Sequence, residues 1–180
     1  MDFLDTLTDR NAAFARNDFA ADLTMMPSTG TIVVGCVDPR VDPALVLGLA
    51  QGEAAVIRNV GGRVDEHLID TLGVLRVVAQ AAGRPGGVRN LVLLHHSDCG
   101  IIGCYHQAPD LLARHLGVGR DALDTMHVTD PHKAVAHDIA ALRANEQLAD
   151  GTIVTGLVYD VATGLIETVV PPGPLRPATS

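Results

Sequence analysis

Tryptophan is absent from this sequence, and aromatic residues make up only 3% of it. A hydrophobic core must therefore be built from Val, Leu, Ile and Ala, a composition that suits a parallel sheet covered by helices on both faces. Apolar residues reach 47%, charged residues are limited to 19%, and the mean hydropathy is +0.24, so the chain is too apolar to remain disordered. Its 180 residues predict one domain spanning 1–180.

Basic residues are also scarce. Lys and Arg total 13 against 21 Asp and Glu, the formal net charge is −8, and the only lysine is Lys133. Because nucleic-acid binding needs a basic stripe that displaces counterions from phosphates, we expect no nucleic-acid partner. No segment approaches the ~20 apolar residues that cross a bilayer, which predicts no membrane partner. The opening MDFLDTLTDR lacks the basic start and apolar run of a signal peptide, so we expect a cytoplasmic protein.

Hydrophobic patterning predicts an α/β domain. Strands are expected at 31–37, 54–58, 90–96, 152–159 and 165–170. Helices are expected over 1–17, over 65–82 after an Asp65 N-cap, over 101–119 with an interruption at Pro109, and after Asp130-Pro131. Strands that alternate with helices and end in a hairpin indicate a mostly parallel sheet flanked by helices. We expect residues 1–25 to form an N-terminal helical arm and the proline-rich tail 171–180 to fray.

Two motifs follow predicted strands: CVDPR at 36–40 and HSDCG at 96–100. The chemistry of parallel sheets gathers beyond the C-terminal ends of strands, so we expect Cys36, His96 and Cys99 to meet there. Two thiolates and one imidazole suit zinc. Cys36 would be a third ligand from a distant strand. This arrangement differs from that of a zinc finger, whose ligands come as two pairs that are each close together in the sequence. Three ligands leave a fourth tetrahedral position open, as in catalytic zinc sites.

Plainer explanations apply to the same residues. A single cysteine is more often a small buried hydrophobe than a ligand, although three such residues at two strand ends make that explanation less favourable. The three cysteines (Cys36, Cys99 and Cys104) are too few for a disulfide framework. A purely structural zinc site stays compatible with the ligand count. Its fourth ligand would come from Asp38, His95, His106 or Cys104.

Asp38 and Arg40 favour catalysis over a structural site. Two thiolates cancel the charge of Zn²⁺, so a bound water is acidified less than in a three-histidine site. A carboxylate held by a guanidinium can accept a hydrogen bond from that water and orient it toward substrate. Without its partner, the same carboxylate can bind the metal and close the site. The alternative is a surface ion pair of little energetic weight.

The order Cys-x-Asp-x-Arg followed by His-x-x-Cys resembles the β-class carbonic anhydrases, in particular their shorter bacterial branch. The resemblance extends through IRNVGG at 57–62, HSDCG at 96–100, Arg143 and GLVYD at 156–160, and covers about 31–169. It departs from the family at Pro39, where Ser or Ala is commoner, and lacks the aromatic and glutamine pocket residues of the plant-like branch.

The resemblance implies a four-stranded parallel sheet with one added antiparallel strand. It also implies a tight homodimer gripped by the N-terminal helices, and leaves open whether dimers pair into tetramers. It assigns one Zn²⁺ per chain to Cys36, His96 and Cys99, with Asp38 and Arg40 as the catalytic pair. Water or hydroxide would be the fourth ligand, replaced by Asp38 in a closed, lower-pH state. The implied activity is that of a carbonate dehydratase, a lyase that reversibly hydrates carbon dioxide to bicarbonate and a proton through zinc-bound hydroxide.

Two alternative functions use the same residues. A hydrolase acting on carbonyl sulfide or carbon disulfide would attack a similar electrophilic carbon. A non-catalytic zinc or redox-sensing protein would need a fourth permanent protein ligand and would lose its zinc on thiol oxidation.

The remaining candidates receive structural interpretations. His95 should point to the opposite face of the strand from His96, as a core or interface histidine. Cys104 is interpreted as a buried helix cysteine. Asp98 could hold a residue of the metal site in place or cap the following helix, and the cap is the preferred interpretation. Gly61 and Gly62 are expected to let the backbone approach the metal site. Four further histidines receive no role: His106, His127, His132 and His137.

Overall fold

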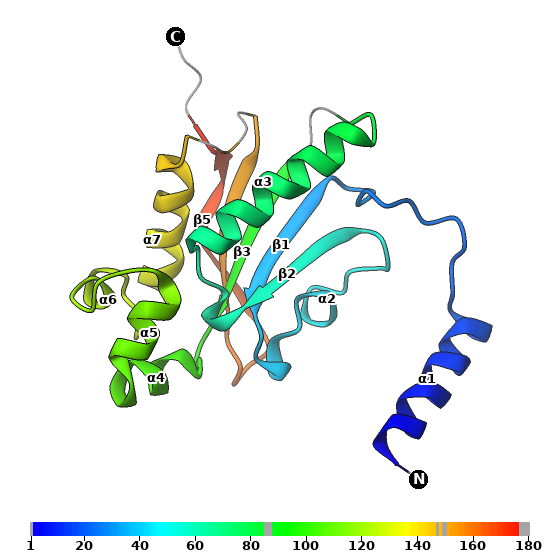
Figure 1. The fold of residues 1–180 in the computed structure, drawn as a ribbon, viewed down its shortest axis with the longest axis horizontal. Helices are drawn as coiled ribbons and strands as arrows, with labels where there is room; N and C mark the ends of the chain where they lie inside the picture. The colour runs from blue at the N-terminus through cyan, green and yellow to red at the C-terminus, as the bar shows by residue number, and fades with distance from the viewer. Residues whose placement is uncertain (1, 85–87, 147, 149–150, 177–180) are drawn as a thin grey trace.

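The structure is a computed structural model that describes residues 2–84, 88–146, 148 and 151–176 (Figure 1). Its single five-stranded sheet has the order β2-β1-β3-β4-β5. The strands are β1 (Thr31–Cys36), β2 (Ala54–Asn59), β3 (Asn90–His96), β4 (Ile153–Tyr159) and β5 (Ile166–Pro174). The first four pair in parallel and β5 is antiparallel to β4. The predicted mostly parallel sheet with one added antiparallel strand is therefore confirmed.

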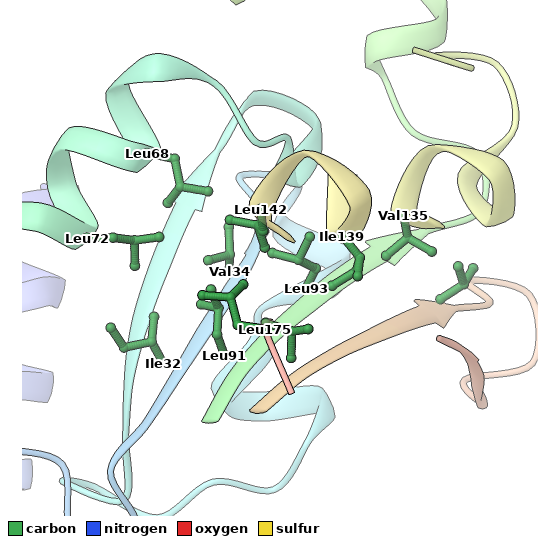
Figure 2. Close-up of a cluster of buried hydrophobic side chains, with 12 residues drawn as sticks. Ile32, Val34, Leu68, Leu72, Leu91, Leu93, Val135, Ile139, Leu142 and Leu175 are labelled. Carbon is green, nitrogen blue, oxygen red and sulfur yellow. The ribbon is translucent and has the colours of Figure 1, made fainter. Parts of the chain in front are cut away.

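Two long helices cover one face of the sheet, α3 (Glu66–Ala81) and α7 (Pro131–Ala144). Their first turns are capped as the sequence predicts, because Asp65 accepts a hydrogen bond from the Leu68 amide and Asp130 accepts from the amides of His132 and Lys133. Figure 2 shows the aliphatic core that these helices form with the sheet. Its buried members include Ile32, Val34, Leu68, Leu72, Leu91, Leu93, Val135, Ile139, Leu142 and Leu175.

The shorter helices lie at the carboxyl ends of the strands (Figure 1). They are α2 (Pro43–Val46), α4 (Ile101–Gln107), α5 (Pro109–Leu116) and α6 (Ala122–Thr125), with 3₁₀ turns at Pro39–Val41 and Val60–Gly62. The predicted break at Pro109 separates α4 from α5. Residues of α4, α5 and α6 build a second apolar cluster around Leu112 and Leu123. No helix in the described ranges is both long and apolar enough to cross a bilayer.

Helix α1 (Phe3–Asn17) lies away from the sheet at the end of an extended segment (Figure 1). None of its residues is buried, and the side chain of Phe3 is 71% exposed. An isolated helix of this length is marginal in water.

The prediction that the chain frays from Pro171 is wrong for residues 171–175. Strand β5 continues to Pro174, which lies opposite Ile153 of β4. The Leu175 amide donates to the Thr152 carbonyl, and the Leu175 side chain is 1% exposed. Prolines are tolerated here because β5 is an edge strand, where a missing N–H costs no ladder bond. Residues 177–180 lie outside the described part of the chain.

Candidate metal centre

Three side chains meet beyond the ends of neighbouring strands. Cys36 is the last residue of β1 and His96 the last of β3, and these parallel strands pair directly. Asp98 has a φ of 53°, in the left-handed region, in the short turn that leads to Cys99. The ligand atoms of Cys36, His96 and Cys99 all lie within 4.8 Å of one another, and the two sulfurs are 3.8 Å apart. The sequence prediction that these residues gather is confirmed.

The imidazole of His96 has one nitrogen free for a metal. Its Nδ1 lies 2.9 Å from the Ser97 carbonyl, which can only accept, so Nδ1 carries the proton. Its Nε2 is buried and has no hydrogen-bond partner among the described residues. Buried polar atoms are nearly always partnered, and metal-bound histidines commonly donate their other N–H to a carbonyl. The donor set therefore fits zinc.

The two thiols are held at different pKa values. A hydrogen bond from Cys99 lowers the pKa of Cys36 to about 4, against the opposing effect of burial, and the hydrogen bond from the Asp38 amide assists. The same hydrogen bond, together with burial, raises the pKa of Cys99. A divalent cation would displace the remaining proton, because thiolates rather than thiols bind metals.

Asp38 and Arg40 form an ion pair beside the cluster. Arg40 Nη2 lies 2.7 Å from Asp38 Oδ2, Arg40 Nε lies 3.1 Å from Oδ1, and the Arg40 amide donates to Oδ1 at 2.9 Å. These hydrogen bonds lower the pKa of Asp38 to about 2, so its carboxylate is ionised at any physiological pH. Because the pKa of Asp38 is lower in the folded state, the ion pair stabilises the fold at pH values above 3.8, the ordinary pKa of an aspartate. This contribution is lost as the pH falls toward 2.

Pro39 fits this loop. It is the first residue of the 3₁₀ turn Pro39–Val41, for which Asp38 is the N-cap. The N–H at the first helical position has no partner inside the turn, so its absence costs no hydrogen bond. The departure from the family at Pro39 therefore leaves the Asp38–Arg40 geometry intact.

The prediction that Asp98 caps the following helix is wrong. The N-cap of α4 is Gly100, and no side chain caps it. Instead, the Asp98 carboxylate accepts from Arg40 Nη1 at 2.8 Å, and the Asp98 carbonyl accepts from Nη2 at 2.9 Å. Arg40 is thus held between Asp38 and Asp98, and both carboxylates raise its pKa.

Arg58 is a further contributor that the sequence analysis did not single out. From the end of β2 it donates to the carbonyls of Cys36 at 2.8 Å and Asp38 at 2.7 Å, and to the Asp42 carboxylate at 2.6 Å. It therefore fixes the backbone at Cys36 and at Asp38. Arg58 could have been found from the sequence, because it lies at the end of a predicted strand, where the functional residues of parallel sheets gather.

Gly62 brings the turn Val60–Gly62 against the backbone of Cys36. Its φ is +66°, and an added Cβ would lie 3.2 Å from the Cys36 nitrogen and from the Gly35 carbonyl carbon. The expected close approach of the glycines to the site is confirmed at this position.

We expect Gly62→Ala to lower the free energy of unfolding by more than the ~1–2 kcal/mol that a left-handed conformation costs an L-residue, since backbone atoms must also move. Chemical denaturation measures the loss. Gly83→Ala is the matched control, because Gly83 has φ +74° and open space around its Cβ position. Equal losses in the two variants would contradict the close-contact argument.

The other candidates are separate from the cluster. His95 is buried, and its Nε2 lies 3.1 Å from the Gly62 carbonyl, which confirms it as a core histidine. Cys104 is half-buried in α4 and its thiol faces the Ala108 carbonyl at 3.9 Å. Within the described residues, only Cys36, His96 and Cys99 form a group that could hold a metal.

Comparisons with known proteins agree with this site and fold. The family model described as Carbonic anhydrase matches residues 31–166. The chain is 31% identical over 171 residues to Beta-carbonic anhydrase 1 of Mycobacterium tuberculosis, covering 92% of this chain and 99% of that protein. A crystal structure of carbonic anhydrase from Streptococcus mutans matches with a TM-score of 0.71 and 32% identity, covering 94% and 98% of the two chains. A carbon disulfide hydrolase shares the fold at 18% identity and a TM-score of 0.60, covering 92% and 89%.

The chain therefore belongs to the carbonic anhydrase family. Within that family its relatives and its sheet place it in the β class, as the two motifs predicted. It is an enzyme of the carbonate dehydratase type.

Proposed function

We propose that this protein reversibly hydrates carbon dioxide to bicarbonate and a proton, using one Zn²⁺ held by Cys36, His96 and Cys99. The observation that carries the proposal is the meeting of two sulfurs with an unpartnered, buried imidazole nitrogen. Zinc, when bound, supplies a water acidified enough to act as a nucleophile near neutral pH.

Asp38 orients the nucleophile. Its ionised carboxylate can only accept hydrogen bonds, so it fixes a water or hydroxide with the proton toward itself and a lone pair toward substrate. Arg40 holds both carboxylate oxygens and so prevents Asp38 from rotating. The same bonds keep Asp38 from becoming a fourth ligand, which it would be in a closed state. The intact pair of this structure supports an open site.

The test combines metal analysis with stopped-flow carbon dioxide hydration at pH values on both sides of neutrality. We expect one zinc per chain, two sulfurs in its X-ray absorption spectrum, and turnover that rises with pH. Zinc-loaded protein without turnover would overturn the proposal. Hydrolysis of carbonyl sulfide or carbon disulfide in that protein would favour the alternative hydrolase, whereas four permanent protein ligands would favour a non-catalytic role.

The protein's own copy is the partner we propose for α1. Apolar side chains of this helix are exposed, among them Phe3, Leu4 and Leu7. Because a helix of this length is marginal in water on its own, packing of these side chains against another surface would stabilise it. A homodimer in which each α1 packs on the other subunit would bury them.

The free thiols further suit a reducing compartment, which supports a cytoplasmic location.

We expect the double variant Phe3→Ser, Leu7→Ser to shift the dimer toward monomer, because it removes apolar area from that interface. Sedimentation equilibrium over a range of protein concentrations measures the shift. Asp9→Ala on the same helix is the control and should keep the wild-type mass. A monomeric wild-type protein, or an unchanged dimer in the double variant, would contradict this role of α1.

A further inference from the structure

A buried ion pair behind the candidate metal centre has no part in the proposed chemistry. Arg63 follows the turn Val60–Gly62 and Asp138 lies in α7, and their exposed fractions are 1% and 0%. Arg63 Nε lies 2.8 Å from Asp138 Oδ2, and Nη2 lies 2.9 Å from Oδ1. Burial of two charges carries a large desolvation cost, and an apolar pair of similar volume is often as stable. Stability alone is therefore a weak explanation for this pair.

Asp138 also contacts the two segments beside the pair. The Val64 amide donates to Oδ2 at 3.2 Å, and His95 Nε2 lies 3.4 Å from the same oxygen. His95 Nε2 is also 3.1 Å from the Gly62 carbonyl, and since both neighbours are acceptors, this nitrogen carries a proton shared between them. One carboxylate on α7 thus holds the end of β3 and the chain that leaves the glycine turn.

The glycine turn connects this polar group to the other strand end. Gly62 packs against the backbone nitrogen of Cys36, as described above. The Arg63 carbonyl accepts from Asn59 Nδ2 at 2.8 Å, and Asn59 pairs with Cys36 between β2 and β1. The turn is therefore fixed on one side to Cys36, and on the other to the residue that precedes His96.

We propose that Asp138, Arg63 and His95 are positioning residues that hold the Gly61–Gly62 turn between β1 and β3 and thereby fix the separation of Cys36 and His96. The inference rests on the proposed function, in which these two residues are metal ligands. A cavity of about 10 Å³ borders Arg63, His95 and His96, which is room for about one water molecule.

The test replaces both charges together, as Arg63→Met with Asp138→Leu. If the pair merely stabilises the fold, an apolar replacement that keeps the melting temperature should also keep the metal site. We expect instead a melting temperature close to wild type, together with zinc release into a chelator that is about 10-fold faster or more. In the cobalt-substituted protein, we expect the sulfur-to-metal charge-transfer bands to shift.

Leu142→Ala is the matched control, because Leu142 is buried one turn further along α7 and belongs to the apolar core. It should lower the melting temperature and leave both the zinc release rate and the cobalt spectrum unchanged. If the double variant does not fold, His95→Phe serves instead, since it keeps a ring and removes the contacts of Nε2. Faster zinc release in that variant supports the proposal.

Wild-type zinc release and cobalt spectra in the folded double variant, or in His95→Phe, would overturn the positioning role. Failure of the proposed function would look different. A wild-type protein that binds zinc but does not hydrate carbon dioxide would overturn the function and leave the positioning comparison valid. A wild-type protein that binds no zinc would overturn both.

Discussion

Cys36→Ser is expected to remove the bound zinc and to lower carbon dioxide hydration by more than about 100-fold. Loss of a residue that only hydrogen-bonds to a metal ligand already costs up to about 100-fold, and loss of a ligand itself should cost more. A serine hydroxyl is a poor zinc ligand beside a thiolate, and the pKa of Cys36, lowered to about 4 by Cys99, makes its thiolate readily available. His96 and Cys99 would remain as two ligands from one loop, too few for a stable tetrahedral site.

The third thiol of the chain provides the control for this experiment. Cys104 lies in α4, outside the cluster, so Cys104→Ser should keep one zinc per chain and near wild-type turnover. Elemental analysis and stopped-flow assays measure both quantities on the same samples. Full zinc occupancy in Cys36→Ser, or zinc loss in Cys104→Ser, would contradict the assigned ligand set.

Asp38→Ala should have the opposite combination of effects, with zinc retained and turnover reduced by about 10²–10⁴-fold, the range for removing a positioned acid–base group. The three candidate ligands stay in place, but no carboxylate remains to orient the attacking oxygen. Because Arg40 holds the pKa of Asp38 at about 2, wild-type activity above pH 5 should be independent of Asp38 protonation.

Asp98→Asn is the matched control for that carboxylate. Asp98 also accepts from Arg40, but its side chain is 77% exposed, and its replacement leaves the bonds between Arg40 and Asp38 in place. We expect turnover within a few-fold of wild type, because an exposed ion pair contributes little. Unchanged turnover in Asp38→Ala with zinc retained would remove Asp38 from the mechanism.

Much of the site could be predicted from the sequence, because its residues lie at strand ends. The boundaries of β3 at 90–96 follow from a run of apolar residues, and parallel pairing places the ends of β1 and β3 together. That rule brings together Cys36 and His96 despite their distance along the chain. The contact of Asp98 with Arg40 could not be predicted, since it depends on a single left-handed residue in a loop.

The ion pair behind the site left a partial signal. Asp138 lies on the apolar face of α7, between Val135 and Leu142, and a carboxylate at a core-facing position indicates a buried partner. Its partner Arg63 could not be identified, because it lies beside an irregular glycine turn with no periodicity to reveal burial. The prediction that the tail frays was wrong for a related reason. Prolines usually end strands, but the prolines here lie in an edge strand, which tolerates them.

The prolines of β5 also affect how the protein behaves at high concentration. Pro171, Pro172 and Pro174 lie within this edge strand and have no N–H to donate. A strand from another molecule needs alternating donors and acceptors, so this border of the sheet is a poor template for aggregation. The opposite border, β2, contains no proline and keeps its donors, so it is the edge where intermolecular strand pairing would begin.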